Sequence, residues 1–482
     1  HIVNRLKSLV RGHYSVIIPL VLFLLLELPF LNNSRPALTD ESFYSNPAYN
    51  FIHGFYFINT NIGYGGNGLI TYTLYLSSFF LILGTSLFTA RLSSVILGII
   101  SIFILRKMFK ILEASEMSVL LSLSFFILSN NYLSVFKFAR PEALTITLCL
   151  LLLLSLYYYI KNGLSTKYLI IILLLTFAIT NSHPFGSLII TVAGFIMLFF
   201  IIKEKRYAKI YHPALLVIGY VLSLLFVVLL ISVSNGISFG ESLFIVSDRS
   251  SSDSFTVRLI EKIKVTIDYY VLSNRIITFL PHVVILTAGL FFARKNRNVF
   301  NLSLLGFLSI IIAYVTLSPT MFSNTFAYFF IFSTLALPIM LGSIKANKYI
   351  YYSAVVFIAL TVILNIAAYS VLTYKSFDPS IGRKNKKIVS LIPNGAKIVS
   401  GPSFWFIDPA KEIRDWGYYY KDPAQIQTDE FYVITYETDK TEKRQLIDSI
   451  ACNNTHTIDT LLRINSKTYG KTDLIKLSLK KQ

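Results

Sequence analysis

Residues 69–88, LITYTLYLSSFFLILGTSLF, decide how the chain is arranged, because a membrane-crossing helix here would reverse the sidedness of everything that follows. The stretch is long enough to cross, since a helix needs about 20 apolar residues to span the hydrocarbon core. It is also rich in Tyr, Ser and Thr, and mixtures of aromatic and polar side chains favour the membrane–water interface. The composition therefore favours a helix along the membrane surface, and charges elsewhere in the chain test this.

The rest of the chain is far too apolar for a soluble protein. Of its 482 residues, 54% are hydrophobic and 14% are charged, whereas a soluble domain has about 25% charged residues. Eleven further apolar runs are candidates for membrane helices, at residues 14–31, 90–108, 117–134, 142–160, 167–182, 185–202, 213–233, 276–293, 299–318, 324–343 and 349–373. The sequence therefore predicts a polytopic α-helical membrane protein. The first run has no small-residue cleavage site and is expected to stay as an anchor.

Short clusters of Lys and Arg separate these runs and decide between the two positions for residues 69–88. Besides the N-terminal cluster at residues 5–11, clusters lie at residues 106–110, 161–167, 203–209, 294–297 and 345–348. Cytoplasmic loops of membrane proteins carry the excess of Lys and Arg. If residues 69–88 crossed, the five later clusters would lie outside; if they do not cross, every cluster is cytoplasmic, together with the N-terminus. We therefore predict eleven spanning helices.

The same topology places the first loop, residues 32–89, and the tail after residue 374 on the outer side. The loop is expected to contain one or more helices along the membrane surface. The tail has strand-like runs at residues 396–400, 431–436 and 474–479. It also has a helical stretch at residues 441–450. This pattern is typical of a small α/β domain. We therefore predict a membrane domain at residues 1–374 and an extracytoplasmic α/β domain at residues 375–482.

The net charge of +19 follows from this topology and does not indicate a nucleic-acid partner. The basic residues lie between apolar runs, as membrane topology requires. Their expected partners are anionic lipid headgroups or an anionic lipid-linked substrate. Cys149 lies in an apolar run and Cys452 in the tail, so a disulfide between them is not expected, and no spacing typical of a metal site is present.

Ionisable residues gather at the outer level of this predicted topology. Asp40 and Glu41 follow the first helix, Arg91 begins the second, and the fourth begins at Arg140-Pro141-Glu142. Charged groups at such depths are costly and usually functional. A carboxylate in a partly dry interface can act as a general base, and nearby arginines can hold a phosphate. This combination suits transfer of a group from a lipid phosphate to an acceptor outside the membrane.

Four motifs in this order resemble those of a known family. They are Asp40-Glu41 with Tyr44, then GTSLFTARLSS at residues 84–94, ARPE at residues 139–142 and HPFG at residues 183–186. Together with an outer C-terminal domain, they are similar to the GT-C glycosyltransferases, in particular the bacterial relatives of protein O-mannosyltransferases and of the lipid A aminoarabinose transferase. The chain departs from the family at residues 65–69, GGNGL, where relatives often carry Lys-Pro-Pro and hence a phosphate-binding lysine.

The resemblance implies an inverting glycosyltransferase of the bacterial inner membrane that uses a polyprenyl-phosphate sugar. The acceptor would be a lipid, a glycan or a protein on the outer face. In the family, an acidic residue of the first loop activates the acceptor hydroxyl, which carries over to Asp40 first and Glu41 second. The expected contacts to substrate or phosphate are Tyr44, Arg91, Arg140, Glu142, His183 and Arg249, with Arg275 as a further candidate for the leaving phosphate.

Each of these residues also has a structural interpretation. Asp40 and Glu41 would stabilise the N-terminal end of a helix through its dipole. Arg140 and Glu142 could form an ion pair with each other, and His183 before a proline could be a turn residue satisfied by the backbone. Arg91 could extend to the interface from a helix end. Arg249 lies in a Ser-rich stretch that is typical of an outer loop. Trp405 and Trp416 in the tail could be core residues or could stack on a sugar.

Two other functions remain alternatives: a transporter or flippase for a lipid-linked glycan, and a non-catalytic scaffold for envelope assembly. Transporters usually show internal repeats and charges at mid-membrane; here the charges gather at the outer rim, which favours the transferase. The use of a metal is also left open. A monophosphate leaving group can be served by Arg and Lys, whereas a diphosphate more often needs a divalent ion such as Mg²⁺ or Mn²⁺.

Overall fold

A computed structural model describes the chain at residues 2–32, 39–54, 69–235, 238–240, 264, 268, 276–293, 297–317, 326–375, 377–393, 396–400, 405–406, 413–414, 431–436, 456–466 and 470–479. The chain divides into two compact units. The first, the bundle unit, is His1–Glu27, Ser94–Lys137 and Pro141–Ser370. The second, the loop–sheet unit, is Leu28–Ser93, Phe138–Arg140 and Val371–Gln482.

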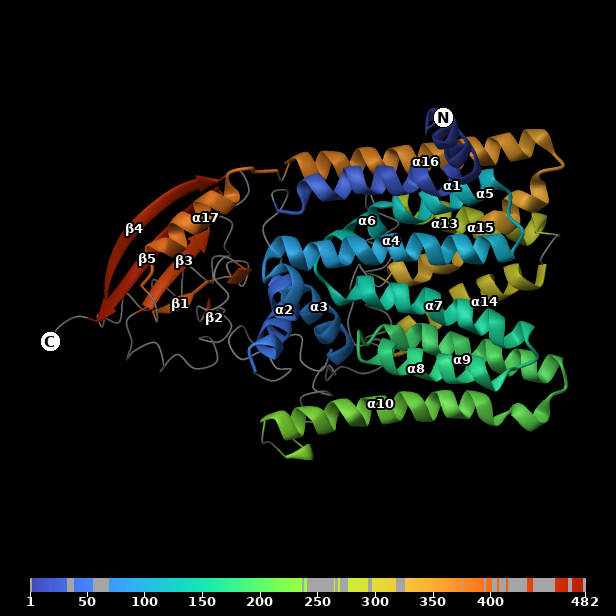
Figure 1. Cartoon of the computed structure of the whole chain (residues 1–482), viewed down its shortest axis with the longest axis horizontal. Coiled ribbons are helices and arrows are strands. Elements are labelled where there is room, and N and C mark those ends of the chain that lie inside the picture. Colours follow the sequence, from blue (N-terminus) through green and yellow to red (C-terminus); the bar gives the residue numbers. More distant parts are fainter. Residues whose placement is uncertain are drawn as a thin grey trace. The chain divides into compact units, whose positions relative to one another are not determined.

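The bundle unit consists of helices, most of them apolar (Figure 1). They are α1 (Ile2–Glu27), α4 (Leu87–Ile111, from Ser94 on), α5 (Glu116–Ile127), α6 (Asn130–Lys137), α7 (Pro141–Lys161), α8 (Thr166–Thr180), α9 (Gly186–Lys203), α10 (Tyr211–Asn235), α13 (Ile276–Phe292), α14 (Arg297–Leu317), α15 (Phe326–Ile344) and α16 (Lys348–Lys375). Helix α1 packs on α5, α15 packs on α5, α13 and α14, and α7, α8, α9 and α10 form a neighbouring group. Every apolar run predicted as a membrane helix coincides with one of these helices, or with two in the case of residues 117–134.

The surfaces of these helices are those of an integral membrane protein. Within the described ranges, six helices are long and apolar enough to cross a membrane, or seven if α5 and α6 form one span. Helix α10 exposes Val217, Val221, Leu225 and Leu229 in one row and buries the polar Ser223. Such a row, repeated every four residues, has a favourable environment in lipid and not in water. The predicted total of eleven crossings stays a prediction, because α8, α13, α14 and α15 are shorter apolar segments by the same measure.

One predicted membrane helix, residues 117–134, is broken into two. Helix α5 ends at Ile127 and α6 begins at Asn130, with a bend of 61° between them. Ser129 begins the new helix, because its Oγ accepts from Tyr132 N at 3.5 Å, and Asn130 N donates to Asn365 Oδ1 on α16 at 3.0 Å. These bonds satisfy N–H groups that a helix start leaves without partners. Helix α6 then continues to Lys137, which is buried.

Close approach of the bundle helices depends on glycine at defined positions. A Cβ atom on Gly306 of α14 would lie 2.4 Å from the Phe332 ring of α15, and one on Gly98 of α4 would lie 2.7 Å from Phe23 of α1. Small residues of this kind let helix backbones approach in membrane proteins, where dispersion contacts replace the hydrophobic effect between helices.

In the loop–sheet unit, two short helices precede α4. Helix α2 (Thr39–Ile52) packs on α3 (Ile70–Leu83), and Ser77 Oγ donates to Ala48 O at 3.1 Å. Helix α3 has 14 residues, which make about 21 Å, less than the roughly 30 Å of a bilayer core. It buries Ser77 and exposes Leu81 and Ile82, the latter at 80%. A short helix with its apolar face outward suits the predicted place along the membrane surface, and that place stays a prediction.

The tail of this unit forms a five-stranded sheet with the order β2-β1-β3-β5-β4 (Figure 1). The strands are β1 (Lys397–Val399), β2 (Ile413–Arg414), β3 (Phe431–Tyr436), β4 (His456–Ser466) and β5 (Gly470–Leu479). Strand β1 is parallel to β2 and β3, whereas β5 is antiparallel to β3 and β4. Helix α17 (Ile381–Ser390) covers the sheet, and a shared core is formed by Ile381, Ile388, Val389, Ile392, Ile398, Ile434 and Leu474.

Three of the five strands lie where the sequence predicts strands, whereas β2 and β4 do not. The predicted runs at residues 396–400, 431–436 and 474–479 coincide with β1, β3 and β5. Strand β4 is the edge of the sheet and exposes Asp459, Thr460 and Arg463, so its apolar alternation is weak. The helical stretch predicted at residues 441–450 lies outside the described residues.

The segment entering α17 is held by Asp378. Its Oδ1 accepts from Ser380 N at 2.9 Å and from Ser380 Oγ at 2.5 Å, and its Oδ2 lies 3.2 Å from Lys384 Nζ. Burial by itself would raise the pKa of Asp378, but the hydrogen bonds from Ser380 and the charge of Lys384 outweigh it and lower the pKa below its ordinary 3.8. The ionised carboxylate therefore stabilises the start of α17.

Replacing this carboxylate should loosen α17 in a pH-dependent way. Asp378→Ala should lower the local stability of α17 by about 1 kcal/mol at neutral pH, because an Asx turn and its lysine partner are lost. Because the pKa of Asp378 is lower in the folded protein than in the unfolded chain, its ionised carboxylate stabilises the fold at pH values above the unfolded-state pKa. This stabilisation is lost as the pH falls through the folded-state pKa. Protection factors for the amides of residues 381–390, measured by hydrogen exchange, should differ between the two proteins near pH 7 and converge below about pH 3. Equal differences at both pH values would contradict this.

Candidate functional site

The two acidic residues of the first loop lie in the first turn of α2, where the helix dipole favours negative charge. Although they are adjacent in sequence, they have opposite environments. The Glu41 side chain is completely buried, at 0% exposure, whereas the Asp40 side chain is 46% exposed. The pair therefore provides one carboxylate that water and a substrate can reach and one that they cannot.

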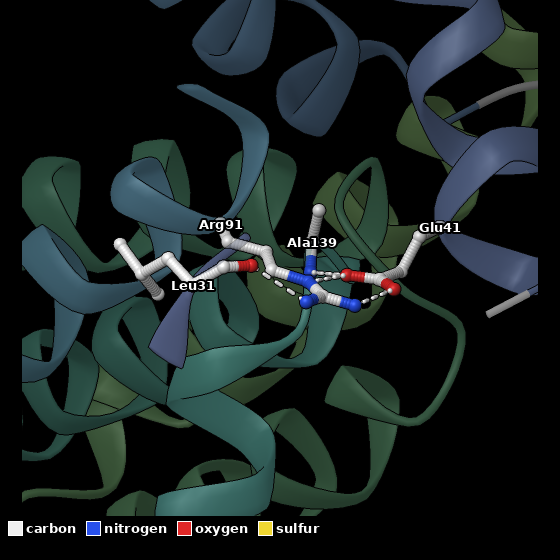
Figure 2. A network of polar contacts seen from close by, with 4 residues as sticks. All are labelled: Leu31, Glu41, Arg91 and Ala139. Carbon is white, nitrogen blue, oxygen red and sulfur yellow. Dashed lines mark hydrogen bonds and ion pairs between the residues drawn. The ribbon is translucent and has the colours of Figure 1, made fainter. Parts of the chain in front are cut away.

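Glu41 is held by Arg91 on both of its oxygens (Figure 2). Arg91 Nε donates to Glu41 Oε1 at 2.9 Å and Arg91 Nη2 donates to Glu41 Oε2 at 2.9 Å, which is a bidentate fork. Arg91 Nη1 donates to the Leu31 carbonyl at 2.6 Å. The Ala139 N–H adds a further bond to Glu41 Oε1 at 2.8 Å. Arg91 is as completely buried as Glu41.

This network joins four stretches that are distant in sequence. Glu41 and Arg91 are 50 residues apart, and Glu41 and Ala139 are 98 apart. The guanidinium also lies over the Phe138 ring, with Cζ 5.4 Å from the ring centroid, a cation–π contact. A buried charge is tolerated when it is paired and its remaining hydrogen-bonding groups are satisfied. The network therefore fixes where α2, the first turns of α4 and residues 138–140 lie.

Asp40 is paired with Arg140, whose Nη2 lies 3.2 Å from Asp40 Oδ2. Arg140 is 16% exposed, so the pair lies at the edge of the buried network. The bond from Ala139 N to Glu41 places the next residue, Arg140, beside α2. Three of the residues predicted for the site, Asp40, Arg91 and Arg140, are thus brought together with Glu41 in one cluster, which we term the carboxylate cluster.

Tyr44 lies on the same face of α2 as Asp40, because residues four apart are neighbours on a helix. Its ring packs edge-on against Tyr72 of α3, with 6.3 Å between ring centroids. Tyr44 thus also belongs to the packing between α2 and α3, next to the carboxylate cluster.

Glu142 and His183 belong to the bundle unit, at the starts of neighbouring helices. Glu142 is buried in the first turn of α7. His183 is also buried, and its Nδ1 accepts from Phe185 N at 3.3 Å while its ring packs on the Phe185 ring. Thr145 of α7 and Ser182 share a hydrogen bond of 2.8 Å, which ties the two segments together. The bond from Phe185 N agrees with the structural interpretation of His183 as a turn residue.

The last residue of the HPFG motif, Gly186, has a packing role. A Cβ atom there would lie 2.2 Å from Ile179 Cγ2 and 3.0 Å from Thr145 Cγ2. A larger residue would therefore push α9 away from α7 and α8. The motif thus combines a turn, a helix start and a close approach between three helices.

Other predicted residues are either buried or outside the described ranges. Trp405 is buried and packs on Tyr49 of α2, with 5.7 Å between ring centroids, so it is a core residue. Arg249, Arg275 and Trp416 lie outside the described residues. Among the residues that the structure describes, no group of three or more His, Cys, Asp or Glu side chains could hold a metal ion.

Two partners in the cluster are main-chain groups that the sequence does not reveal. The Leu31 carbonyl and the Ala139 N–H contribute through backbone position, which no residue type signals. Phe138, which precedes the ARPE motif, is an apolar residue in an apolar neighbourhood, and nothing in the pattern distinguishes it from a core residue.

Comparison with known proteins supports the fold. No family model matches the chain, and none of the curated protein sequences compared with it does. Among solved structures, ArnT from Cupriavidus metallidurans in the apo state matches with a TM-score of 0.64 at 9% identity, over 97% of this chain and 98% of that one. The same protein bound to undecaprenyl phosphate matches with a TM-score of 0.59 at 12% identity, over 96% and 97%.

A third similar structure is the oligosaccharyltransferase of Archaeoglobus fulgidus in complex with Zn and sulfate. It matches with a TM-score of 0.56 at 13% identity, over 95% of this chain and 72% of that one. At these identities the likeness concerns the fold. The chain therefore shares the fold of these three solved structures.

Breaking the buried pair on one side should destabilise the chain strongly. Glu41→Ala should lower the free energy of unfolding by about 3–5 kcal/mol, because it leaves Arg91 buried without its counter-charge. The double variant Glu41→Ala/Arg91→Met should lose less than Glu41→Ala alone, since no uncompensated charge remains. The measurement is the unfolding midpoint of the purified chain in detergent.

The matched control is the exposed pair of Glu204 and Arg206, 3.1 Å apart. Glu204→Ala should cost less than about 1 kcal/mol, as exposed pairs do. If Glu41→Ala and Glu204→Ala lowered the midpoint equally, the buried pair would not be a determinant of stability.

Proposed function

We propose that this protein transfers a sugar from a polyprenyl-phosphate donor to a hydroxyl of a lipid, glycan or protein acceptor on the outer face of the membrane. The observation that carries the proposal is the contrast between the two carboxylates. Glu41 is locked by three hydrogen bonds in the buried network, whereas Asp40 is half-exposed beside Arg140. A catalytic carboxylate must be reachable by the acceptor and held in orientation, and Asp40 satisfies both needs.

The GT-C fold supports the donor class. One of the similar structures is bound to undecaprenyl phosphate, a lipid phosphate of the kind that a polyprenyl-phosphate sugar leaves behind. The exposed apolar side chains of α3, among them Leu81 and Ile82, offer a surface along which a lipid tail can lie. Both features agree with a donor that enters the site from the membrane.

In the proposed reaction, Asp40 accepts the proton of the acceptor hydroxyl. The hydroxyl oxygen attacks the anomeric carbon from the face opposite the phosphate, and a new carbon–oxygen bond forms. The bond from the anomeric carbon to the phosphate oxygen breaks, and its electron pair goes to the phosphate. The configuration at the anomeric carbon is therefore inverted. Because the leaving group is a monophosphate, cationic side chains can stabilise the charge that it develops.

We assign the two arginines different roles. Arg91 is buried and directed at Glu41 and the Leu31 carbonyl, so we propose that it positions the cluster; this replaces its predicted contact with phosphate. Arg140 lies at the edge of the network, and we propose that it orients Asp40 and adds positive charge near the departing phosphate. Tyr44, Glu142, His183 and Arg249 remain proposed substrate contacts.

The proposed reaction requires a defined orientation in the membrane. We propose that the N-terminus and the basic linkers are cytoplasmic and that α2, α3 and the tail are extracytoplasmic, in a bacterial inner membrane. The basis is the distribution of Lys and Arg over the linkers. In this orientation Asp40 lies on the side to which lipid-linked sugars are presented for envelope assembly.

Replacing the exposed carboxylate should abolish transfer and leave the fold intact. Asp40→Asn should reduce turnover by about 10²–10⁴-fold, the usual contribution of a general base, whereas its unfolding midpoint should stay close to that of the unmodified chain. Turnover is measured with purified protein, a panel of polyprenyl-phosphate sugars and a hydroxyl acceptor, by the release of polyprenyl phosphate.

Glu204→Gln is the matched control, because Glu204 is also a partly exposed carboxylate paired with an arginine. It should transfer sugar at the unmodified rate. Unmodified turnover in Asp40→Asn would remove Asp40 as the base. A chain that moves lipid-linked sugar across vesicles without any cleavage would instead support the transporter alternative.

A further inference from the structure

The end of the bundle unit where α7 and α9 finish carries a second cluster of charged residues, formed by two linkers. The linker after α7 and the linker after α9 are about 40 residues apart in sequence, yet they are bonded directly. Arg206 Nη1 donates to the Gly163 carbonyl at 2.7 Å, and Lys209 Nζ donates to the Gly163 and Leu164 carbonyls at 3.0 and 2.6 Å. Basic side chains thus satisfy carbonyl groups at the C-terminal end of α7, where the helix dipole also favours them. We term residues 161–167 and 203–211 the basic collar.

The basic collar has a strong excess of positive charge. It contains six basic side chains and one acidic side chain, Glu204, which pairs with Arg206. Four lysines point outward and form no ion pair within the described part of the chain: Lys161, Lys167, Lys203 and Lys205. Arg206 is exposed but already bonded to the Gly163 carbonyl and to Glu204, and Lys209 is bonded to the backbone. The four lysines are therefore the cations of the collar that can bind an external anion.

Exposed apolar and aromatic groups are interleaved with these lysines. Tyr207, Ile210 and Tyr211 are all more than half exposed. Lys161 Nζ lies 5.8 Å from the Tyr157 ring centroid, and Lys203 Nζ lies 5.6 Å from that of Phe200. Aromatic rings beside lysines at the end of a membrane helix are typical of the level where lipid headgroups meet acyl chains.

The linker after α4 lacks this combination. There Arg106 Nη2 is bonded to His13 Nδ1 at 2.7 Å, and the remaining cations are Lys107 and Lys110. The linker before α16 carries two lysines, Lys345 and Lys348. Among the described residues, no basic side chain of either linker bonds to the backbone of a second basic linker, as Arg206 and Lys209 do at residues 163 and 164.

From this arrangement we propose that the basic collar binds the headgroup of an anionic glycerophospholipid. The four outward lysines attract the phosphate, and Tyr207, Ile210 and Tyr211 contact the first part of the acyl chains. Clusters of basic residues at the end of membrane helices recognise anionic lipids by this combination of charge and interface depth. The site is separate from the carboxylate cluster in sequence and does not depend on the proposed transfer reaction.

The test compares lipid binding to three forms of the full-length chain in detergent. One variant replaces the collar lysines by glutamine: Lys161→Gln, Lys167→Gln, Lys203→Gln and Lys205→Gln. The control variant removes the same charge from other exposed linker positions: Lys107→Gln, Lys110→Gln, Lys345→Gln and Lys348→Gln. Phosphatidylglycerol is the anionic probe, phosphatidylcholine is the zwitterionic reference, and bound lipid is counted by native mass spectrometry.

The collar variant should bind phosphatidylglycerol roughly tenfold or more weakly than the unmodified chain, and the control variant should bind it like the unmodified chain. Phosphatidylcholine binding should not differ between the three forms. Added undecaprenyl phosphate should leave the bound phosphatidylglycerol in place. The proposal is overturned if both variants lose the anionic lipid equally, if neither does, or if undecaprenyl phosphate displaces it. Unchanged unfolding midpoints show that the variants are folded.

Discussion

The buried pair of Arg91 and Glu41 is the interaction on which the loop–sheet unit depends. An arginine and a glutamate without solvent contact can coexist only if each is bonded in the right geometry, because an uncompensated buried charge costs several kcal/mol. Here the fork between the two side chains, the Leu31 carbonyl and the Ala139 N–H supply those bonds. The position of α2 is thereby set by charge as well as by apolar packing. The orientation of Asp40, one residue earlier, follows from it.

Adjacent carboxylates with different environments can have different chemical roles. Glu41 is withdrawn from solvent and fully engaged, whereas Asp40 is half-exposed and paired with Arg140 at the edge. Neighbouring residues on a helix point about 100° apart, so one turn of α2 can direct one carboxylate inward and the other outward. The sequence pattern assigns the same chemistry to both residues, and burial separates them.

The hydropathy and charge along the chain predict much of the architecture. The apolar runs locate the helices because lipid and core both require continuous apolar faces, and three of the strands are visible as alternating runs. What the pattern cannot show depends on single bonds. The break at Ser129 depends on a hydroxyl and on Asn365 more than 200 residues away. The network of Arg91 and Glu41 includes two main-chain groups. Strand β4 was not predicted because the exposed Asp459, Thr460 and Arg463 weaken its apolar alternation. In the carboxylate cluster, residue types indicated which residues belong together, and the structure was needed to show which of their side chains are buried.

The buried network also has a consequence for biosynthesis. Its parts emerge from the ribosome in the order Leu31, Glu41, Arg91, Ala139, and the last follows Glu41 by 98 residues. Until Arg91 is made, the carboxylate of Glu41 lacks the two hydrogen bonds from that guanidinium, and burying it would be costly. We therefore expect the segment that contains Glu41 to stay hydrated while the later helices are inserted. We expect closure of the pair to mark a nascent chain whose first four apolar runs, up to residue 134, have reached their correct places.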